Sequence, residues 1–246
     1  GGRGQFRFYS SDLKDEEEVR QQLLDDLRDA LAKGELSMHY QPVVSIENST
    51  VVCLEALMRW DHPKRGNISP TEFIPIAEMS DLIEPLGMFA LERSSSDLME
   101  WERQTGELPI FVSVNLSSAQ LISSEIYNDI RAMLVKTQCD PKRIKLELTE
   151  SVVMENPEQA RLMLEKLKDT GISLALDDFG TGYSSLGYLK KAPFDKIKID
   201  QSFVLGAADP NSMNAAIISS IVGLATALNM ETTAEGVETH DDLALI

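Results

Sequence analysis

The chain has 246 residues, a length that suits one large domain or two small ones. Its formal net charge of −17 argues against nucleic acid or an acidic membrane surface as a partner. A small phosphate ligand remains compatible with that charge if metal ions or local lysine and arginine side chains reverse its sign inside a pocket. The two cysteines, Cys53 and Cys139, have no zinc-binding spacing, which indicates buried thiols in a reducing compartment.

Neither a membrane-spanning segment nor a secretory signal is predicted. No apolar run reaches the roughly 18 residues that a spanning helix needs, and the chain opens on glycine and arginine. We therefore expect a cytoplasmic domain. The chain does not begin with Met, so we expect a piece of a longer protein, and that parent protein is free to be membrane-anchored elsewhere.

The first predicted elements are a short strand over residues 1–9 and a helix over residues 16–33. Acidic residues crowd the first turn of this helix, and Gly34 ends it. Its apolar side chains fall on one stripe at helical spacing, which predicts packing on the following domain.

Predicted strands and helices alternate from Leu36 onward. The strands cover residues 36–45, 50–57, 109–115, 143–149, 172–177, 194–200 and 230–235. The helices cover residues 70–79, 86–104, 123–137, 157–170, 184–190 and 211–228. This alternation predicts an α/β fold, with a parallel sheet and helices outside it. Polar residues at many strand ends favour a closed, TIM-like (β/α) barrel over an open sheet.

Acidic residues close several of these apolar strands. They are Glu55, Glu147, Asp177 with Asp178 next to it, and Glu235. An acid in that place is poorly suited to packing, whereas acids that converge from several strand ends are well suited to hold a hard divalent cation. Taken singly, each acid fits equally well a loop cap or a surface position, so it is the joint pattern that indicates a site.

Two further polar residues complete the predicted constellation. Asn115 ends one strand, and Lys198 alternates with isoleucines in another, so that Lys198 shares a face with Asp200. Carboxylate and amide oxygens favour Mg²⁺ or Mn²⁺ over zinc or copper. The neighbouring Asp177 and Asp178 suggest two ions, an arrangement typical of phosphate-ester cleavage, in which Lys198 would hold the attacking water or a phosphate oxygen.

A glycine-containing segment, Asp178-Phe179-Gly180-Thr181-Gly182, follows one of these strands. Its spacing matches neither a dinucleotide fingerprint nor a P-loop. We expect either a mobile loop that carries Asp178 into the site or a static, well-packed turn.

The chain resembles the EAL domain family from about Leu36 to Glu238. The resemblance rests on many ordered blocks: Gln41-Pro42, Glu55-Ala56-Leu57-Met58-Arg59-Trp60, Ser113-Val114-Asn115-Leu116-Ser117, Glu147-Leu148-Thr149-Glu150-Ser151, Asp177-Asp178-Phe179-Gly180, Lys198-Ile199-Asp200 and Ala234-Glu235-Gly236-Val237-Glu238. It implies a (β/α)₈ barrel with an antiparallel first strand. It also implies a bacterial signalling phosphodiesterase that opens cyclic di-GMP to linear pGpG with Mg²⁺ or Mn²⁺.

The resemblance also implies a role for each matching residue. The ligands of the first metal are Glu55, Asn115, Glu147 and Asp177, and the second metal adds Asp178 and shares Asp177. Lys198 contacts the attacking water, Glu235 is the general base or a water-mediated metal contact, and Glu150 steadies the loop after the strand that ends in Asp177. The substrate contacts are Gln41, Arg59 and Glu238; Asp200 is added here because it shares a strand face with Lys198.

Two departures accompany the resemblance. The family's final strand and helix are absent from the 246 residues, so we expect a C-terminally incomplete domain over residues 35–246. Residues 1–10 resemble the last strand of a GGDEF domain, which makes residues 11–34 a connector helix from an upstream cyclase-like domain. A homodimer is expected because family members commonly dimerise. Two alternatives stay open: a cyclic di-GMP receptor without turnover, and a regulatory domain that acts through dimerisation.

Overall fold

The computed structural model describes residues 11–106, 108–181, 186–205, 207, 209 and 212–245. Within them the chain forms two compact units, residues 11–39 with 58–86, and residues 40–57 with 87–245. The strand expected over residues 1–9 lies outside the described residues. None of the described helices has both the length and the apolar character needed to cross a membrane.

The first unit contains the long helix α1 (Ser11–Lys33), the hairpin strand β3 (Gly66–Ile68) and helix α2 (Pro70–Glu78). Leu23 and Leu27 of the predicted helical stripe of α1 are buried, and so is Ala30, whereas Val19 of the same stripe is 47% exposed. Ser69 caps α2 by accepting a hydrogen bond from the Thr71 amide, and Pro70 occupies the first turn.

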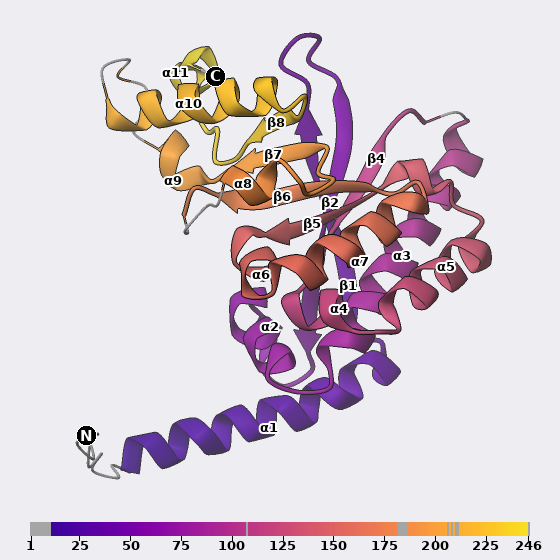
Figure 1. The fold of residues 1–246 in the computed structure, drawn as a ribbon. Helices are drawn as coiled ribbons and strands as arrows, with labels where there is room; N and C mark the ends of the chain where they lie inside the picture. The colour runs from indigo at the N-terminus through magenta and orange to yellow at the C-terminus, as the bar shows by residue number, and fades with distance from the viewer. Residues whose placement is uncertain are drawn as a thin grey trace. The chain divides into compact units, whose positions relative to one another are not determined.

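The strands of the sheet run in the order β1-β2-β4-β5-β6-β7-β8, and β3 pairs with β2 off this path (Figure 1). Their bounds are β1 (Leu36–Val44), β2 (Val51–His62), β4 (Phe111–Asn115), β5 (Ile144–Thr149), β6 (Ser173–Phe179), β7 (Lys196–Ile199) and β8 (Glu231–Ala234). From β2 to β8 each neighbouring pair on this path is parallel. A tight turn, in which the Ser45 amide donates to the Thr50 carbonyl oxygen, returns β1 antiparallel to β2. The fold is therefore a curled, mixed α/β sheet of the TIM-barrel kind with an antiparallel first strand.

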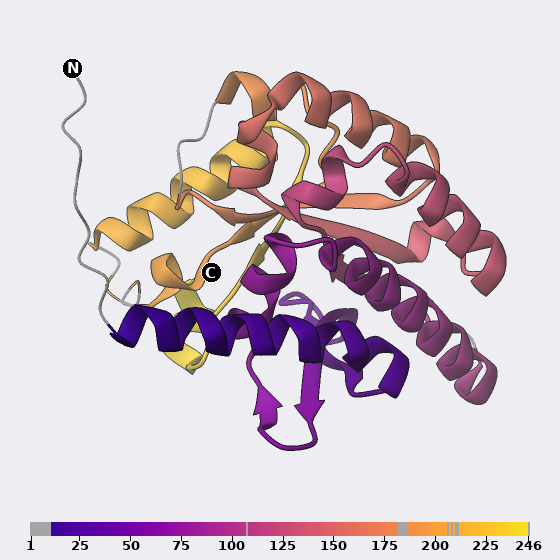
Figure 2. The ribbon, with the colours of Figure 1, turned by 90° about the horizontal axis from the view of Figure 1, so that it is seen from below.

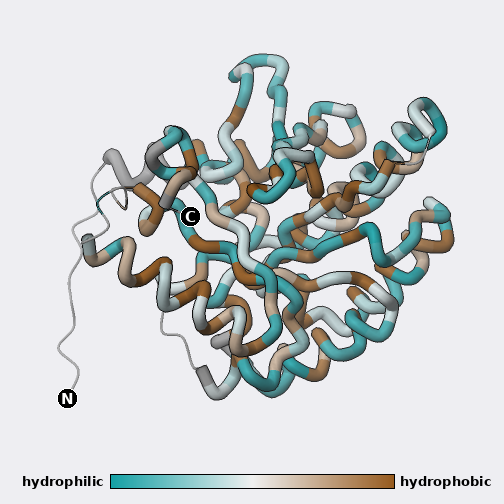
Figure 3. The backbone as a smooth tube through the Cα atoms, turned by 90° about the horizontal axis from the view of Figure 1, so that it is seen from above, coloured by the Kyte–Doolittle hydropathy of each residue, from teal (hydrophilic) through white to brown (hydrophobic). Residues whose placement is uncertain are grey.

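Helices of the second unit lie outside its strands (Figure 2). They are α3 (Ile83–Thr105, which begins in the first unit), α4 (Ser118–Ile122), α5 (Ile126–Thr137), the 3₁₀ turn η1 (Pro141–Arg143), α6 (Glu150–Glu155), α7 (Pro157–Asp169), α8 (Leu186–Leu189), α9 (Gln201–Val204), α10 (Met213–Ala227) and α11 (His240–Leu245). Leu174 and Leu176 of β6 are buried, as are Leu164 and Leu167 of α7, which contacts that strand. Hydrophobic and hydrophilic stretches alternate along the chain (Figure 3), which is the pattern that this layering requires.

The structure corrects several predicted boundaries. The strand expected over 50–57 continues to His62, because Trp60 and Asp61 pair with Ile68 and Asn67 of β3. The helix expected over 123–137 begins only at Ile126, as α5, and the short helix α4 before it was not expected; Ser123, with an extended backbone, ends α4. The short elements η1, α6, α9 and α11 were not expected from the sequence, since elements of three to six residues leave little periodicity.

Candidate active site

The register of the sheet brings the strand-end polar residues to one edge. Asn115 of β4 lies directly opposite Glu147 of β5, and Asp177 of β6 lies opposite Thr149 of β5. Glu55 of β2 is opposite Ser113, two residues before Asn115. The carboxyl ends of neighbouring parallel strands lie next to one another, so these strand-end side chains gather at the same end of the sheet.

Lys198 of β7 lies at the centre of the group. Its ammonium nitrogen Nζ is 2.7 Å from Glu147 Oε2, 2.9 Å from Asp177 Oδ2 and 2.7 Å from Glu235 Oε1. Glu55 Oε2 is 3.5 Å from the same nitrogen, and Asn115 Nδ2 donates to Glu55 Oε1 at 3.3 Å. Lys198 is only 2% exposed, so this convergence takes place inside the protein.

Asp178 reaches the same site because the strand is irregular at that point. Successive residues of a regular strand point to opposite faces, which would turn Asp178 away from Asp177. Here the pairing of β6 with β7 shifts register between Leu176 and Phe179, and Asp178 adopts a left-handed backbone with φ of 52°. The Asp178 amide donates to Asp177 Oδ1 at 2.9 Å.

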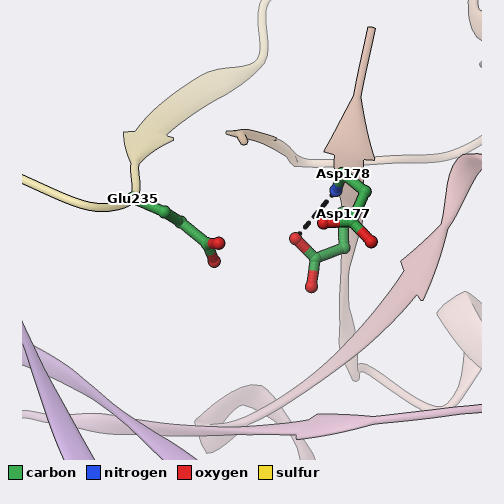
Figure 4. Close-up of side chains that lie close together, drawn as sticks. All are labelled: Asp177, Asp178 and Glu235. Atoms are coloured by element: carbon green, nitrogen blue, oxygen red, sulfur yellow. Dashed lines mark hydrogen bonds between the residues drawn. The ribbon is translucent and has the colours of Figure 1, made fainter. Parts of the chain in front are cut away.

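Three of these acids form a group that can hold a metal ion. One carboxylate oxygen from each of Asp177, Asp178 and Glu235 lies within 4.8 Å of the others. Figure 4 shows Glu235 pointing from the end of β8 toward the two aspartates. A cluster of oxygen donors without histidine or cysteine suits a hard divalent cation.

The electrostatics of the site also indicate a cation. Five carboxylates, those of Glu55, Glu147, Asp177, Asp178 and Glu235, gather around the single ammonium of Lys198. Burial alone would lower the pKa of Lys198, but the surrounding carboxylates together raise it, so it remains protonated. Burial raises the pKa of Glu147, Glu235 and Asp178, and for Glu147 and Glu235 this outweighs the opposing effect of Lys198. When all five acids are ionised, one ammonium cannot balance them, so the residues present fit a bound metal ion.

Glu150 contacts the segment that follows β6. Its side chain is buried, and its Oε2 accepts a hydrogen bond from the Gly180 amide at 3.2 Å. Gly180 itself has φ of +96°, a backbone conformation that favours glycine, and a Cβ there would make a tight contact of 3.1 Å with the Phe203 ring. The question of a mobile loop or a static turn concerns residues 182–185 as well, which lie outside the described residues.

The four predicted substrate contacts lie on different elements. Gln41 is exposed on β1, and Arg59 belongs to the first unit, where its Nη1 donates to the Met58 carbonyl oxygen at 2.9 Å. Asp200 caps α9 by accepting from the Ser202 amide at 3.0 Å. The Glu238 amide donates to Asp242 Oδ2 at 3.3 Å, at the start of α11. Their roles in substrate binding stay predictions.

The sequence reasoning missed a second set of inward-facing polar residues. Lys145 of β5 and Lys196 of β7 each stand two residues before a site residue, Glu147 and Lys198, and therefore face the same side. Burial, and then the nearby Lys196 ammonium, lower the pKa of Lys145. Lysine alternates with apolar residues in Ile144-Lys145-Leu146 and Lys196-Ile197-Lys198, and this alternation could have predicted that Lys145 and Lys196 face the same side as the site residues.

An α/β sheet with an acid-rich centre at the carboxyl ends of its strands defines a candidate metal-dependent enzyme. Residues 24–246 match the EAL domain, and the chain belongs to that family. It is 39% identical over 239 residues to the bifunctional diguanylate cyclase/cyclic di-GMP phosphodiesterase MucR of Pseudomonas aeruginosa, covering 97% of this chain and 35% of MucR. It is 37% identical over 246 residues to the cyclic di-GMP phosphodiesterase PdeR of Escherichia coli, covering all of this chain and 37% of PdeR.

The solved structures agree with this assignment. The phosphodiesterase of MucR from Pseudomonas aeruginosa, solved as a c-di-GMP complex, superposes with a TM-score of 0.86 at 39% identity. That alignment covers 91% of this chain and 90% of the solved chain. The chain spans only 29–37% of the length of the curated relatives that it matches, so those relatives contain further regions.

Proposed function

We propose that this domain is a phosphodiesterase that hydrolyses cyclic di-GMP to linear pGpG with Mg²⁺ or Mn²⁺. The observation that carries the proposal is the convergence of acids from β2, β5, β6 and β8 on the buried Lys198 ammonium. The substrate is inferred from the relatives and from the solved c-di-GMP complex of MucR.

The proposed metal ligands are the residues whose oxygens gather at this edge. Glu55, Asn115, Glu147 and Asp177 would hold one ion, and Asp178 would hold a second that shares Asp177. Bound divalent ions supply charge neutralisation for the phosphorus oxygens and lower the pKa of a bound water. The proximity of Asp177 and Asp178, whose carboxylate oxygens lie within 4.8 Å of each other and of one from Glu235, supports a metal site at this position. The excess of acids supports a total positive charge greater than that of Lys198.

The remaining side chains would position and deprotonate the nucleophile. Lys198 is protonated and held in place by carboxylates, so it can donate a hydrogen bond to the attacking water and fix its position. Glu235 lies next to Lys198, and burial raises its pKa toward the range in which a carboxylate accepts a proton effectively. Glu150 would act through the Gly180 amide as a positioning residue for the segment that begins with Asp178.

The interaction partners form a second part of the proposal. We infer a cytoplasmic homodimer with an upstream GGDEF-like domain in the same polypeptide. MucR, a bifunctional diguanylate cyclase and cyclic di-GMP phosphodiesterase, supports the domain pairing. Light scattering of the full-length protein tests the dimer: a monomer at all concentrations would contradict it.

The decisive experiment is product analysis on the full-length protein with each metal. We expect cyclic di-GMP to be converted to pGpG, and Glu55→Gln to reduce turnover by about 10²–10³-fold. Glu47→Gln is the matched control, because Glu47 is an exposed acid in the turn before the same strand. Tight binding of cyclic di-GMP without pGpG in either metal would instead support a receptor, and neither binding nor turnover would support a purely regulatory domain.

A further inference from the structure

The segment that connects β4 to α4 carries one of the proposed metal ligands. Asn115 is the last residue of β4, Leu116 follows it, and Ser117 is the N-cap of α4. The Leu116 amide donates to the Glu147 carbonyl oxygen at 2.8 Å, which fixes this part of the segment to β5. Asn115 is exposed, and its hydrogen bond to Glu55 Oε1 is long at 3.3 Å. The place of its side chain therefore depends on the backbone on either side of it.

Ser117 is held by a capping box whose other member is buried. Gln120 Oε1 accepts hydrogen bonds from the Ser117 amide at 3.1 Å and from the Ser117 hydroxyl at 3.0 Å. In return, Ser117 Oγ accepts from the Gln120 amide at 3.4 Å. Gln120 is only 2% exposed, so the surrounding atoms confine its side chain. A confined side chain thus fixes the backbone two residues beyond Asn115.

The Gln120 side chain occupies the space beside Gly87 of α3. A Cβ at Gly87 would lie 1.7 Å from Gln120 Nε2 and 2.6 Å from Gln120 Cδ, so a larger residue fits there only if Gln120 moves. Gly87 lies inside the helix, where glycine is less stable than alanine. The space that Gln120 needs is therefore the reason for glycine at this position.

Gln120 and Gly87 both lower the stability of the fold. Gln120 Nε2 is buried and has no hydrogen-bond partner among the described residues, and a buried donor without an acceptor is destabilising. An apolar residue at position 120 and alanine at position 87 would avoid both losses. Local losses of this kind are typical of functional sites, and what Gln120 provides in return is its hold on Ser117.

We propose that Gln120 and Gly87 are positioning residues for Asn115. Gly87 leaves the space in which Gln120 lies, and Gln120 fixes Ser117. Ser117 in turn sets the backbone that presents the Asn115 amide oxygen to the metal ion. An amide oxygen carries no full charge, so its contribution to metal binding depends strongly on where it lies. The inference rests on the proposed function, because that function makes Asn115 a metal ligand.

Mn²⁺ binding to the full-length protein tests the inference, with electron paramagnetic resonance reporting the free ion. Gln120→Met keeps the length of the side chain but removes its acceptor, and it should lower the Mn²⁺ affinity of the site by about tenfold. Gln104→Met is the matched control, because Gln104 is an exposed glutamine of α3 that donates to Glu100, and it should leave the affinity unchanged.

The wild type and Gln120→Met together distinguish two failures. If the wild type bound no Mn²⁺ at this site, the proposed function would be overturned, and this inference with it. If the wild type bound Mn²⁺ and Gln120→Met bound it equally well, the inference alone would be overturned.

A double-mutant cycle separates positioning from a general loss of structure. If Gln120 acts through Asn115, Gln120→Met should cause no further loss of Mn²⁺ affinity in a protein that already carries Asn115→Ala. Asn115→Ala also identifies which binding step belongs to this site. An equal loss with and without Asn115→Ala would contradict the proposal, because Gln120 would then affect the site by another route.

Gly87 tests the same contacts from the other end. Gly87→Ala should lower both the melting temperature and the Mn²⁺ affinity, because it displaces Gln120. Gly223→Ala, at a glycine of α10 with no atom within 4 Å of its Cβ position, should instead raise the melting temperature by about 1–4 °C and leave the affinity unchanged.

The double variant Gly87→Ala/Gln120→Ala separates stability from metal binding. It should recover the melting temperature lost in Gly87→Ala, because the clash is gone, while its Mn²⁺ affinity stays low. Recovery of the Mn²⁺ affinity together with the melting temperature would overturn the proposal, since Gln120 would then be dispensable for the metal site.

Discussion

The amino ends and the carboxyl ends of the parallel strands differ in how their charged side chains are paired. At the amino ends, Arg143 donates to the carbonyl oxygens of Leu108 and Ile110 and pairs with Glu102 at 2.7 Å. Lys168 pairs there with Asp195, which also accepts from the Leu174 amide at 2.8 Å. At the carboxyl ends, five carboxylates face one ammonium. Charges matched within the chain stabilise the fold, whereas an unmatched cluster indicates a site that must bind something else.

The largest expected effect is on turnover at the carboxyl ends. Asp177→Asn should lower the cleavage of cyclic di-GMP by about 10³-fold or more, because it removes the carboxylate that both proposed metal ions share. The metal-free protein should not lose stability, since the change relieves repulsion among the acids. Steady-state kinetics and thermal unfolding measure the two quantities.

Asp129→Asn, at an exposed acid in the first turn of α5, is the control for that substitution and should leave both quantities unchanged. If Asp177→Asn destabilised the metal-free protein while keeping turnover, the acidic centre would be structural, and the contrast between the two ends would be lost.

The opposite outcome is expected at the amino ends. Arg143→Met should lower the free energy of unfolding by about 2–4 kcal/mol, because Glu102 and two carbonyl oxygens lose their partner. Turnover at a temperature where the variant is folded should stay within about twofold of the wild type, since Arg143 lies at the far ends of the strands. Urea denaturation and kinetics provide the measurements.

Arg103→Met is the matched comparison, because the Arg103 side chain is 72% exposed in its pair with Glu100. Its stability should change by less than about 0.5 kcal/mol. An equal loss in both variants would mean that the contacts of Arg143 with the carbonyl oxygens contribute nothing.

A smaller effect is expected next to Glu235. Gly236 has φ of +71°, and a Cβ at this position would lie 2.6 Å from the Gln201 Cβ. Gly236→Ala should therefore displace Glu235 and lower turnover by about ten- to a hundredfold. Gly34 has the same φ of +71° with no atom within 4 Å of its Cβ position, so Gly34→Ala reports the backbone strain alone. Equal turnover in the two variants would show that the clash with Gln201 is relieved without moving Glu235.

The smallest expected effect is the dependence of metal-free stability on pH. Burial raises the pKa of Glu147 above its usual 4.5 and raises that of Glu235 in the same way, so the folded chain holds protons that the unfolded chain releases. As the pH rises from about 4.5 through the raised pKa values, deprotonation of Glu147 and Glu235 lowers the free energy of unfolding of the metal-free protein. The free energy stays lower at higher pH.

In chelator, the melting temperature should therefore fall by about 2–4 °C as the pH rises from 5 to 7, and saturating Mg²⁺ should reverse the fall. Asp177→Asn should show a weaker dependence, because one of the neighbouring charges has been removed. A melting temperature that rises with pH in chelator would show that other groups dominate this range.

Much of the fold followed from periodicity in the sequence. Alternating strand and helix patterns predicted a parallel sheet with outer helices, and the buried Leu174, Leu176, Leu164 and Leu167 have the positions that this layering requires. The acids Glu55, Glu147, Asp177 and Glu235 could be placed at one edge because parallel strands end on the same side. The resemblance to EAL domains then supplied a substrate, which the acids alone did not.

Other features depend on contacts between residues that are distant in the chain. A regular strand would have turned Asp178 away, and only the shift in the pairing of β6 with β7 brings it beside Asp177. No local sequence pattern could predict the hydrogen bonds of Arg143, because its acceptors, the carbonyl oxygens of Leu108 and Ile110, belong to the segment that leads into another strand.

The sequence by itself determined the alternation of strands and helices, the family, and which acids end the strands. It could do so because side-chain periodicity and strand ends are local properties of the chain. The tertiary structure decided that Lys198 is the centre of those acids and that Asp178 joins them. These are results of sheet register and of side-chain reach across strands, which set distances between residues that no local pattern encodes.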